Sequence, residues 1–481
     1  IFLWSDGNVV SDNIIGMTWN KSNFLPNNYG IEISWGNQNV IGSGNVIAGN
    51  SDHGVYVYHA DDNLIYGNYI GYPFVIGGGG NDGDGVHVHA SANNTISKGN
   101  VISENGGNGI YVNGSAGTVI TGNGIGGNTK DGIHMKSSDG QIGDSGELNR
   151  NGIGGNGDDG IHLDSSSDVT IKNNYIGLDS GAFDAGNQGH GILVENGSSN
   201  NTIGGEKSGE GNWIGWNQKS GIYLSGSGTQ NNYILRNVLG APINWGWEAP
   251  NGNHGVGVYD GANDNWIGGL GIGNTIIASG WSGVAIVESS YNHVLSNRIG
   301  TNGLGITWGN AFYGVHVVDV AGGDVTNSNA ITFNEIAYNG TANGQDLAQA
   351  GVKIEAAVQN PISQNSIHHN DGPGIQLFNG GNTDLPSPTI SQASCKGPVK
   401  GKAGGPGWTI EIFSDTQNEG RYYEGQTTAD THGDWSWSGT LHGPNVTATA
   451  RTPANDTSPF SSVFPIERCL IPRAYLPLVL R

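Results

Sequence analysis

The sequence predicts an all-β protein, built as a parallel β-solenoid of about 13–14 coils and followed by a small antiparallel β-sandwich. Three observations lead to this prediction. Glycine accounts for 85 of the 481 residues without a collagen-like period. A short apolar pattern that begins with glycine recurs up to residue 380, and no window has the 3.6-residue period of a helix. After residue 384 the pattern stops, and both cysteines of the chain follow.

Each repeat begins with the pattern Gly-[Ile/Val]-x-apolar. The pattern lies at residues 30–33, 54–57, 85–88, 109–112, 132–135, 160–163, 191–194, 221–224, 255–258, 283–286, 314–317, 351–354 and 374–377. The alternation has period two, so the apolar residues face the interior and x faces outwards. A second apolar segment follows in each repeat after an Asn/Gly turn. We therefore expect two or three short strands per coil, each stacked on its copy in the next coil, with glycine at positive φ and asparagine ladders at the corners.

In these repeats the sequence resembles the right-handed parallel β-helix repeat proteins, the pectate-lyase-like superfamily in its broad sense. The resemblance extends over about residues 1–380 and is carried by thirteen copies of the pattern. It implies a right-handed β-helix, and it implies that the outer face of the glycine-led strand is where a substrate would lie. It does not imply one activity, because lyases, hydrolases, epimerases and adhesins share this fold.

The composition divides the chain into three parts. We expect a parallel β-helix over residues 1–384, an Ig-like β-sandwich over 389–470 and a C-terminal apolar tail over 471–481. The segment LPSP at 385–388 ends the repeat with two prolines, and about seven short alternating strands follow it. This second part resembles the small Ig-like modules that follow β-helices in secreted bacterial proteins.

Cys395 and Cys469 are the two cysteines of the chain, and they bracket the predicted sandwich. An even pair in this position predicts one disulfide and an oxidising compartment, whereas two free thiols are the alternative. No apolar run reaches the ~20 residues of a membrane span. The chain opens at Ile1 without a signal-peptide pattern, so any secretion signal was removed or lies upstream. We therefore expect an extracellular or cell-surface protein.

The charge is distributed unevenly and limits the choice of partners. Residues 1–384 hold 11 Lys and Arg against 33 Asp and Glu, whereas residues 385–481 hold 8 of each. Nucleic acid is excluded as a partner because phosphate binding needs clustered cations. The same repulsion disfavours polyanionic glycans unless cations bridge them, so a carbohydrate partner is expected to be neutral or mixed.

The outward x position of the repeats is rich in tyrosine and histidine. Ring faces with polar tips suit sugars, so this column is a candidate glycan-binding face, although β-favouring surface residues are the simpler explanation. The candidate residues are Tyr56, His87, Tyr111, His134, His162 and Tyr223.

Four coils carry a longer insertion at the same place. The insertions lie at residues 71–85, 177–191, 240–255 and 300–314. Trp245, Trp247 and Trp308 lie in them, together with Tyr72, Phe74, Phe183, Phe312 and Tyr313. Exposed rings on neighbouring coils could stack on sugar faces; alternatively, they fold back and cover the wall of the solenoid.

Three coils in succession resemble the motifs of polygalacturonase-type hydrolases. They read NTKDG at 128–132, GDDG at 157–160 and GHG at 189–191. The resemblance implies that Asp131 and either Asp158 or Asp159 act as acid and water-activating carboxylates, and that His190 tunes the acid. Lys130 interrupts the first motif, and the later Arg-x-Lys of that family is absent from this sequence.

We expect no cofactor. If the protein were a lyase, Ca²⁺ would be the cation that its site needs. A lyase site could combine Lys136 with Asp131 and Asp164, or use Asp82 and Asp84. A zinc site of His134, His162 and Asp164 is conceivable, but parallel strands space these side chains as a ladder rather than a tetrahedron. No metal ligands are therefore predicted.

The function that these observations favour is structural, adhesive or glycan-binding, at the cell surface or in an extracellular matrix. A polysaccharide-degrading enzyme, either glycoside hydrolase or lyase, acting on the Tyr/His face is the alternative. The first coil has no visible cap, and the tail at 471–481 is apolar, so homo-oligomers or filaments formed through these ends are a further hypothesis.

Overall fold

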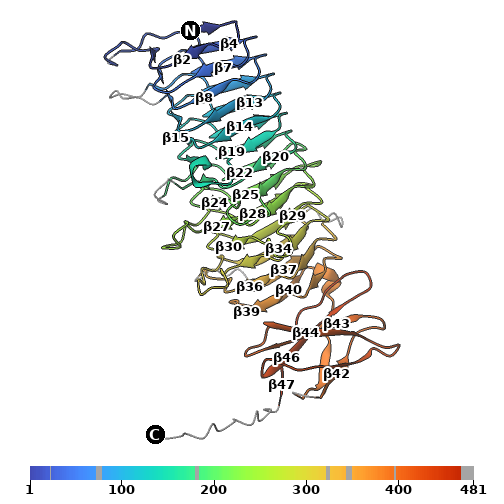
Figure 1. The fold of residues 1–481 in the computed structure, drawn as a ribbon. Helices are drawn as coiled ribbons and strands as arrows, with labels where there is room; N and C mark the ends of the chain where they lie inside the picture. The colour runs from blue at the N-terminus through green and yellow to red at the C-terminus, as the bar shows by residue number, and fades with distance from the viewer. Residues whose placement is uncertain are drawn as a thin grey trace, which may run out of the picture.

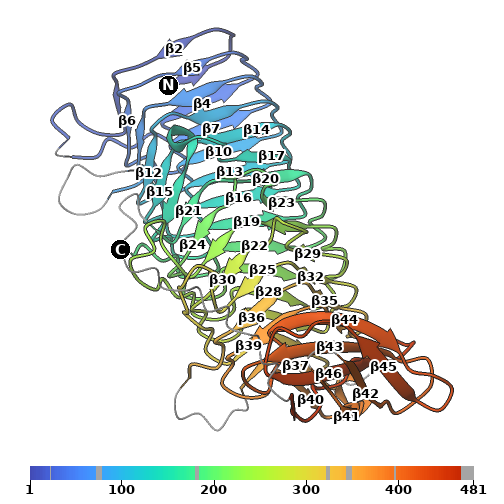
Figure 2. The same cartoon turned by 60° about the horizontal axis from the view of Figure 1, so that its bottom comes forward.

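The computed structural model describes residues 1–21, 23–71, 79–178, 184–320, 326–342, 349–394 and 397–466. The chain winds into a long stack of coils whose strands form three parallel sheets, and a smaller antiparallel module closes the C-terminal end of the stack (Figures 1 and 2). The predicted fold class is confirmed. The described residues contain no α-helix, and therefore no helix that could cross a membrane.

The first sheet has 14 strands and contains the glycine-led pattern. Its strands are β1 (Phe2–Leu3), β4 (Ile31–Ser34), β7 (Val55–Tyr58), β10 (Val86–His89), β13 (Ile110–Asn113), β16 (Ile133–Lys136), β19 (Ile161–Asp164), β22 (Ile192–Glu195), β25 (Ile222–Ser225), β28 (Val256–Tyr259), β31 (Val284–Val287), β34 (Tyr313–Val318), β37 (Ala350–Glu355) and β40 (Ile375–Phe378). Each strand pairs in parallel with the equivalent strand of the next coil.

The second and third sheets have 13 strands each and form the other two walls. The second contains β2 (Val9–Val10), β5 (Val40–Ile41), β8 (Leu64–Tyr66), β11 (Thr95–Ser97), β14 (Thr118–Thr121), β17 (Gly140–Ile142), β20 (Val169–Ile171), β23 (Thr202–Gly204), β26 (Tyr233–Leu235), β29 (Trp266–Ile267), β32 (His293–Leu295), β35 (Ala330–Thr332) and β38 (Ile362–Ser363). The third contains β3 (Ile14–Ile15), β6 (Val46–Ile47), β9 (Tyr69–Ile70), β12 (Val101–Ser103), β15 (Gly124–Gly126), β18 (Gly152–Gly154), β21 (Tyr175–Ile176), β24 (Trp213–Ile214), β27 (Val238–Leu239), β30 (Thr275–Ile276), β33 (Arg298–Ile299), β36 (Glu335–Ala337) and β39 (Ser366–His368).

The interior of the coils is filled by the apolar residues of all three walls. In the strand Val86–His89 the two valines are buried and the two histidines are partly exposed, as the period-two alternation predicts. One continuous cluster of buried Ile, Val, Leu, Met and Ala runs from Val10 to Ile375. Because the register is the same in every coil, residues in equivalent positions form straight columns along the stack.

Asparagine ladders stabilise the corners between the sheets. One runs without interruption from Asn13 to Asn365, and in each step the amide Nδ2 of one asparagine donates to Oδ1 of the next. The side chains also donate to backbone carbonyls, as Asn100 does to Ile65 and Ser97. These contacts satisfy buried polar groups of the turns that no strand pairing reaches.

The C-terminal module is a sandwich of two antiparallel sheets. One contains β41 (Thr389–Gln392), β42 (Pro398–Lys402) and β45 (Asp434–Ser438), and the other contains β44 (Tyr422–Thr428), β43 (Thr409–Asp415), β46 (Asn445–Arg451) and β47 (Phe464–Pro465). Val399, Trp435, Ile410 and Ile412 come from both sheets and share one buried core. Two short 3-10 turns, η1 (Glu147–Asn149) and η2 (Gly381–Asp384), complete the regular structure.

This module caps the last coil of the β-helix. Glu419 accepts hydrogen bonds from the backbone N–H and the side-chain amide of Asn370, both 3.2 Å long. Asp456 accepts the N–H of Gln359 at 2.7 Å. The Phe460 ring packs against the end of the solenoid core. In earlier coils, such N–H groups donate to acceptors in the next coil. At the end of the stack, the module supplies the acceptors instead.

Several sequence predictions lie outside the described residues. They concern Cys395, Cys469, Tyr72, Phe74, Phe183 and the tail at 471–481. The predicted disulfide and the association of the tail therefore stay predictions.

Candidate functional site on the first sheet

The column predicted from the repeat is a straight row on the outer face of the first sheet. Tyr56 pairs with His87, His87 with Tyr111, Tyr111 with His134, and His134 with His162. Leu193 follows, and Tyr223 comes after it. All six candidate rings are partly exposed, so the inward–outward alternation of the repeat places them together on one surface.

The rings of this row contact one another and are joined by further rings. Their centroids lie 5.3 Å apart for Tyr56 and His87, and 4.8 Å apart for His87 and Tyr111. The neighbouring residues join them into one surface, which we call the aromatic face. It consists of Tyr29, Trp35, His53, Tyr56, Tyr58, His59, His87, His89 and Tyr111.

Sequence reasoning missed Tyr29, Trp35, His53 and His59. They lie next to the glycine-led strands rather than at the repeating x position, so the pattern did not select them. In the structure Trp35 stacks on His59 with centroids 4.5 Å apart, and Tyr29 stacks on His53 at 5.7 Å. The sequence signal that could have identified these four residues is a bulky ring close to the glycine-led strand in two neighbouring repeats.

The residue before each pattern glycine forms a second row. Asp131 Oδ1 accepts the backbone N–H of Asp159 at 3.0 Å, and Asp159 Oδ1 accepts the N–H of His190 at 2.5 Å. His190 Nδ1 accepts the N–H of Ser220 at 3.2 Å. Asp131 and Asp159 are only 5% and 3% exposed. Three of the predicted catalytic residues therefore hold successive coils together through their side chains.

Asp158 differs from these two aspartates because it is exposed. Its side chain lies 4.0 Å from Lys219 Nζ. Oxygen atoms of Asp131, Asp158 and Asp159 lie within 4.8 Å of one another, so the three predicted carboxyl groups do come together. Only that of Asp158 is open to solvent.

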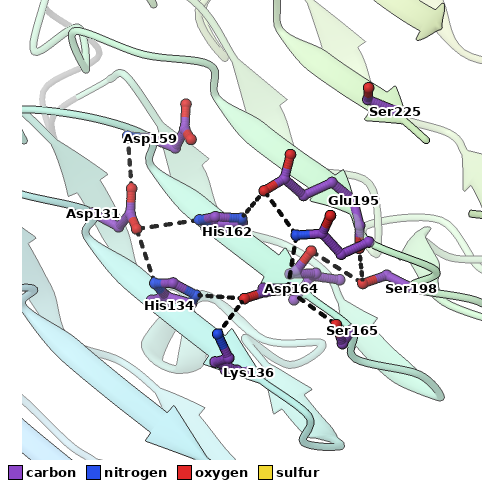
Figure 3. Close-up of polar contacts among 12 residues, drawn as sticks. Asp131, His134, Lys136, Asp159, His162, Asp164, Ser165, Glu195, Ser198 and Ser225 are labelled. Atoms are coloured by element: carbon purple, nitrogen blue, oxygen red, sulfur yellow. Dashed lines mark hydrogen bonds and ion pairs between the residues drawn. The ribbon is translucent and has the colours of Figure 1, made fainter. Parts of the chain in front are cut away.

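Two histidines converge on the second oxygen of Asp131 (Figure 3). Asp131 Oδ2 lies 3.2 Å from His134 Nδ1 and 3.4 Å from His162 Nδ1. The two imidazole rings stack, with centroids 4.3 Å apart and 23° between their planes. Asp131 thus holds both rings from the same side.

A further set of charged groups lies around the other edge of the two rings (Figure 3). His134 Nε2 lies 4.0 Å from Asp164 Oδ2, and His162 Nε2 lies 3.2 Å from Glu195 Oε1. Lys136 Nζ lies 3.0 Å from Asp164 Oδ2. Of the lyase set Lys136, Asp131 and Asp164, the structure joins Lys136 to Asp164, on strands β16 and β19, whereas Asp131 contacts the two histidines.

The two buried aspartates have pKa values displaced in opposite directions. Burial by itself would raise the pKa of Asp131, but hydrogen bonding to His134 and His162 outweighs it and holds the pKa well below its usual range. Burial raises the pKa of Asp159 to about 7, with the charge on Asp131 adding to the effect. Burial lowers the pKa of His190 to about 3, which fits a neutral ring whose Nδ1 accepts a hydrogen bond.

The tryptophans of the long insertions do not form one uniform ridge. Trp245 packs edge-on against Trp213 with centroids 5.6 Å apart. Trp247 is 38% exposed, and Trp308 is partly exposed. Phe312 and Tyr313, from the last insertion, are buried in a small apolar cluster. The insertion rings thus cover the wall in some coils and remain accessible in others.

Comparisons with known proteins agree with the coiled architecture. Residues 79–239 match the family model described as "Right handed beta helix region". No curated protein sequence matches the chain. The match to the family model covers the part of the stack that contains Asp131, His134 and His162.

Several solved structures are similar at low identity. The A-module of the Azotobacter vinelandii mannuronan C-5 epimerase AlgE6 is 16% identical, with a TM-score of 0.47 over 79% of this chain and 89% of that one. The catalytic domain of a GH87 α-1,3-glucanase is 14% identical, with a TM-score of 0.33 over 80% and 62%.

Proposed function

We propose that the protein binds an extended polysaccharide along the aromatic face. The contiguous array of rings from Tyr29 to Tyr111 is the observation that carries this proposal. Aromatic faces pack against the C–H faces of pyranose rings, while tyrosine hydroxyls and imidazole nitrogens exchange hydrogen bonds with sugar hydroxyls. Successive coils add equivalent positions about 4.8 Å apart, which suits a polymer lying along the stack.

The charge of the molecule supports a neutral or mixed glycan as the ligand. The chain has a formal net charge of −22, and residues 1–384 hold the whole excess. A polyanion approaching this surface would be repelled unless cations screened it. An uncharged polymer meets no such barrier.

The hydrogen bonds and burial of the carboxyl groups favour glycan binding over hydrolysis. Asp131 Oδ1 and Asp159 Oδ1 each accept a backbone N–H from the following coil, and both side chains are almost fully buried. A hydrolytic acid or base has to reach the glycosidic bond or its water. Asp158 is the accessible member of the three, so the hydrolase alternative depends on Asp158 finding a second accessible carboxyl group.

A glycan array combined with detection of new reducing ends tests the proposal. We expect retention of one class of neutral polysaccharide without release of reducing ends. Trp35→Ala and Tyr58→Ala should each weaken binding about tenfold, equivalent to 1.4 kcal/mol. The matched control is Tyr233→Ala, which removes a ring that is 41% exposed on the second sheet and should leave affinity unchanged.

Two outcomes would contradict this proposal. Equal loss of binding in the Tyr233→Ala control would mean that the aromatic face is not the binding surface. Release of reducing ends that disappears in Asp158→Asn would establish the hydrolase alternative instead.

An extracellular location and self-association are further proposals. The two cysteines that bracket the sandwich support the first, and non-reducing mass spectrometry of the secreted protein would detect a Cys395–Cys469 bond. Light scattering of the purified chain tests the second, because filaments or oligomers would give a mass that rises with concentration.

A further inference from the structure

We infer that Asp131, His134 and His162 form a binding site for Zn²⁺. Each of the three residues offers one ligand atom, and these atoms lie within 4.8 Å of one another. His134 Nδ1 and His162 Nδ1 both contact Asp131 Oδ2, so we take these three as the ligand atoms. Imidazole nitrogen and carboxylate oxygen are ligands that zinc takes, and a fourth position would remain for water. This inference does not rest on the proposed glycan binding.

The distances between these atoms are long for hydrogen bonds and also fit a shared ion. With metal–ligand bonds of about 2.0–2.1 Å, the edges of a zinc tetrahedron are about 3.3–3.4 Å long. The two edges at Asp131 Oδ2 measure 3.2 Å to His134 and 3.4 Å to His162. Charge-assisted N–H···O contacts are usually shorter, at about 2.7–2.9 Å.

The opposite edges of the two rings resemble the surroundings of metal-bound histidine. Such a histidine donates its second ring N–H to a carboxylate or carbonyl. His162 Nε2 lies 3.2 Å from Glu195 Oε1, and His134 Nε2 is directed to Asp164 Oδ2 at 4.0 Å. His134 Nε2 is buried and has no hydrogen-bond partner among the described residues.

When both rings are neutral with the proton on Nε2, these contacts create a conflict that a cation resolves. A neutral imidazole carries one proton, and if it lies on Nε2, facing Asp164 or Glu195, the Nδ1 lone pair faces the Asp131 carboxylate. Both nitrogen lone pairs then lie against the same carboxylate oxygen, and rotation of the two rings would direct them to one point between the three atoms. A divalent cation at that point attracts all three, and it leaves the Nε2 protons for the outer carboxylates.

A similar trio elsewhere on the same sheet shows what distinguishes the site. His53, Asp84 and His87 also lie within 4.8 Å of one another. There His53 Nδ1 already accepts the backbone N–H of Asp84 at 2.9 Å, so its lone pair is occupied. In the described part of the chain, no backbone N–H donates to Nδ1 of His134 or His162. Of the two trios, this one alone has both nitrogens available.

The site differs from the zinc set considered from the sequence. That set combined the two histidines with Asp164, which lies on the outer side of the rings, and the expected ladder made it unsuitable. Asp131 lies in the neighbouring row, three residues before His134, and approaches both rings from the opposite side. The rings are stacked 23° from parallel, so we expect each to rotate about its Cβ–Cγ bond as the ion binds.

The experiment titrates chelator-treated, full-length protein with ZnCl₂ in a calorimeter and follows CoCl₂ binding by visible absorption. We expect one Zn²⁺ per chain and the absorption bands of four-coordinate cobalt. His134→Gln and His162→Gln should each weaken zinc binding more than about tenfold. The matched control is His87→Gln, which alters the same column and the same Asp-x-x-His spacing but not the site.

Circular dichroism establishes that each variant is folded before its affinity is interpreted. An absence of zinc binding by the folded wild-type protein would overturn the inference. So would binding that His162→Gln leaves intact, or binding that His87→Gln weakens equally. A CaCl₂ titration separates the alternatives further, because a site that prefers Ca²⁺ to Zn²⁺ would be an oxygen site elsewhere.

Discussion

At the scale of the residue, a buried asparagine connects its own coil to the coils on both sides. Asn232 Oδ1 accepts from the backbone N–H and the Nδ2 of Asn201, at 3.1 and 2.9 Å. Asn232 Nδ2 donates to Asn265 Oδ1 at 2.9 Å and to the Ser198 carbonyl at 3.1 Å. The side chain is fully buried. No other residue type of this size offers both an acceptor and a two-proton donor in one plane.

Replacing Asn232 by alanine should destabilise the local stack. The change leaves the backbone N–H and one amide proton of Asn201 without their buried acceptor, and it leaves the Ser198 carbonyl without the donor from residue 232, at a cost of about 3 kcal/mol. We expect faster amide hydrogen exchange in the coils around residue 232. Asn253→Ala is the control, because Asn253 is exposed and its loss should change stability by less than about 0.5 kcal/mol. Equal exchange in the two variants would contradict this account of the ladder.

At the scale of the element, packing requires the glycine that opens the repeated pattern of the first sheet. A Cβ at Gly283 would lie 2.5 Å from Ile299 Cγ2 and 2.7 Å from the Gly314 carbonyl oxygen of the next coil. Both neighbours are fixed, one in the core and one in the sheet. The repeat therefore keeps glycine here because the wall of the next coil leaves no space for a side chain.

Gly283→Ala should destabilise the fold by about 1–3 kcal/mol through overpacking. Gly124, in the third sheet, is the matched control, because a Cβ there would meet nothing within 4 Å. Gly124→Ala should be neutral or should stabilise the protein by up to about 1 kcal/mol, since alanine loses less entropy on folding. Thermal melting of the two variants gives the comparison. An equal fall in melting temperature would show that close packing is not the reason for Gly283.

The sequence was sufficient to predict the strands and the outward column, because both follow from a local period-two pattern repeated many times. The register that pairs His134 with His162 follows from aligning the repeats. The approach of Asp131 to both rings could not be predicted in this way, since it depends on the rotamers of three side chains in two rows. Trp35 and Tyr29 were missed because they lie outside the repeating positions.

At the scale of the whole molecule, the end of the stack is closed by groups that no repeat pattern contains. Glu419 and Asp456 reach the last coils from the sandwich and accept backbone N–H groups of Asn370 and Gln359. Glu419 and Asn370 are 49 residues apart in the sequence, and Asp456 and Gln359 are 97 residues apart. Nothing in the local composition of the sandwich predicts such contacts, so the cap became visible only in three dimensions.

The cap should weaken as the pH rises. Burial, with the nearby charge of Asp415, raises the pKa of Glu419 from 4.5 to about 7. The folded state therefore binds the proton more tightly than the unfolded state, and its stabilisation is complete below pH 4.5 and is lost as the pH rises through about 7. The difference corresponds to about 3 kcal/mol.

Melting curves of the wild type and Glu419→Gln from pH 4 to 8 test this dependence. In the glutamine variant an NH₂ group replaces one acceptor oxygen. The resulting loss in free energy of unfolding does not change with pH. We expect the wild type to lose stability relative to the variant as the pH rises. A constant difference between the two proteins would contradict the assignment to Glu419.

Because the register of the coils is constant, the length of the stack is proportional to the number of coils. Each coil advances the structure by about 4.8 Å and presents its outward residues at the same place. Adding or removing one complete coil between two asparagine contacts would therefore change the length of the outer surfaces without changing the spacing of their residues. The length of the outer surfaces is then set by the number of coils, and can be altered in whole steps while the cap stays the same.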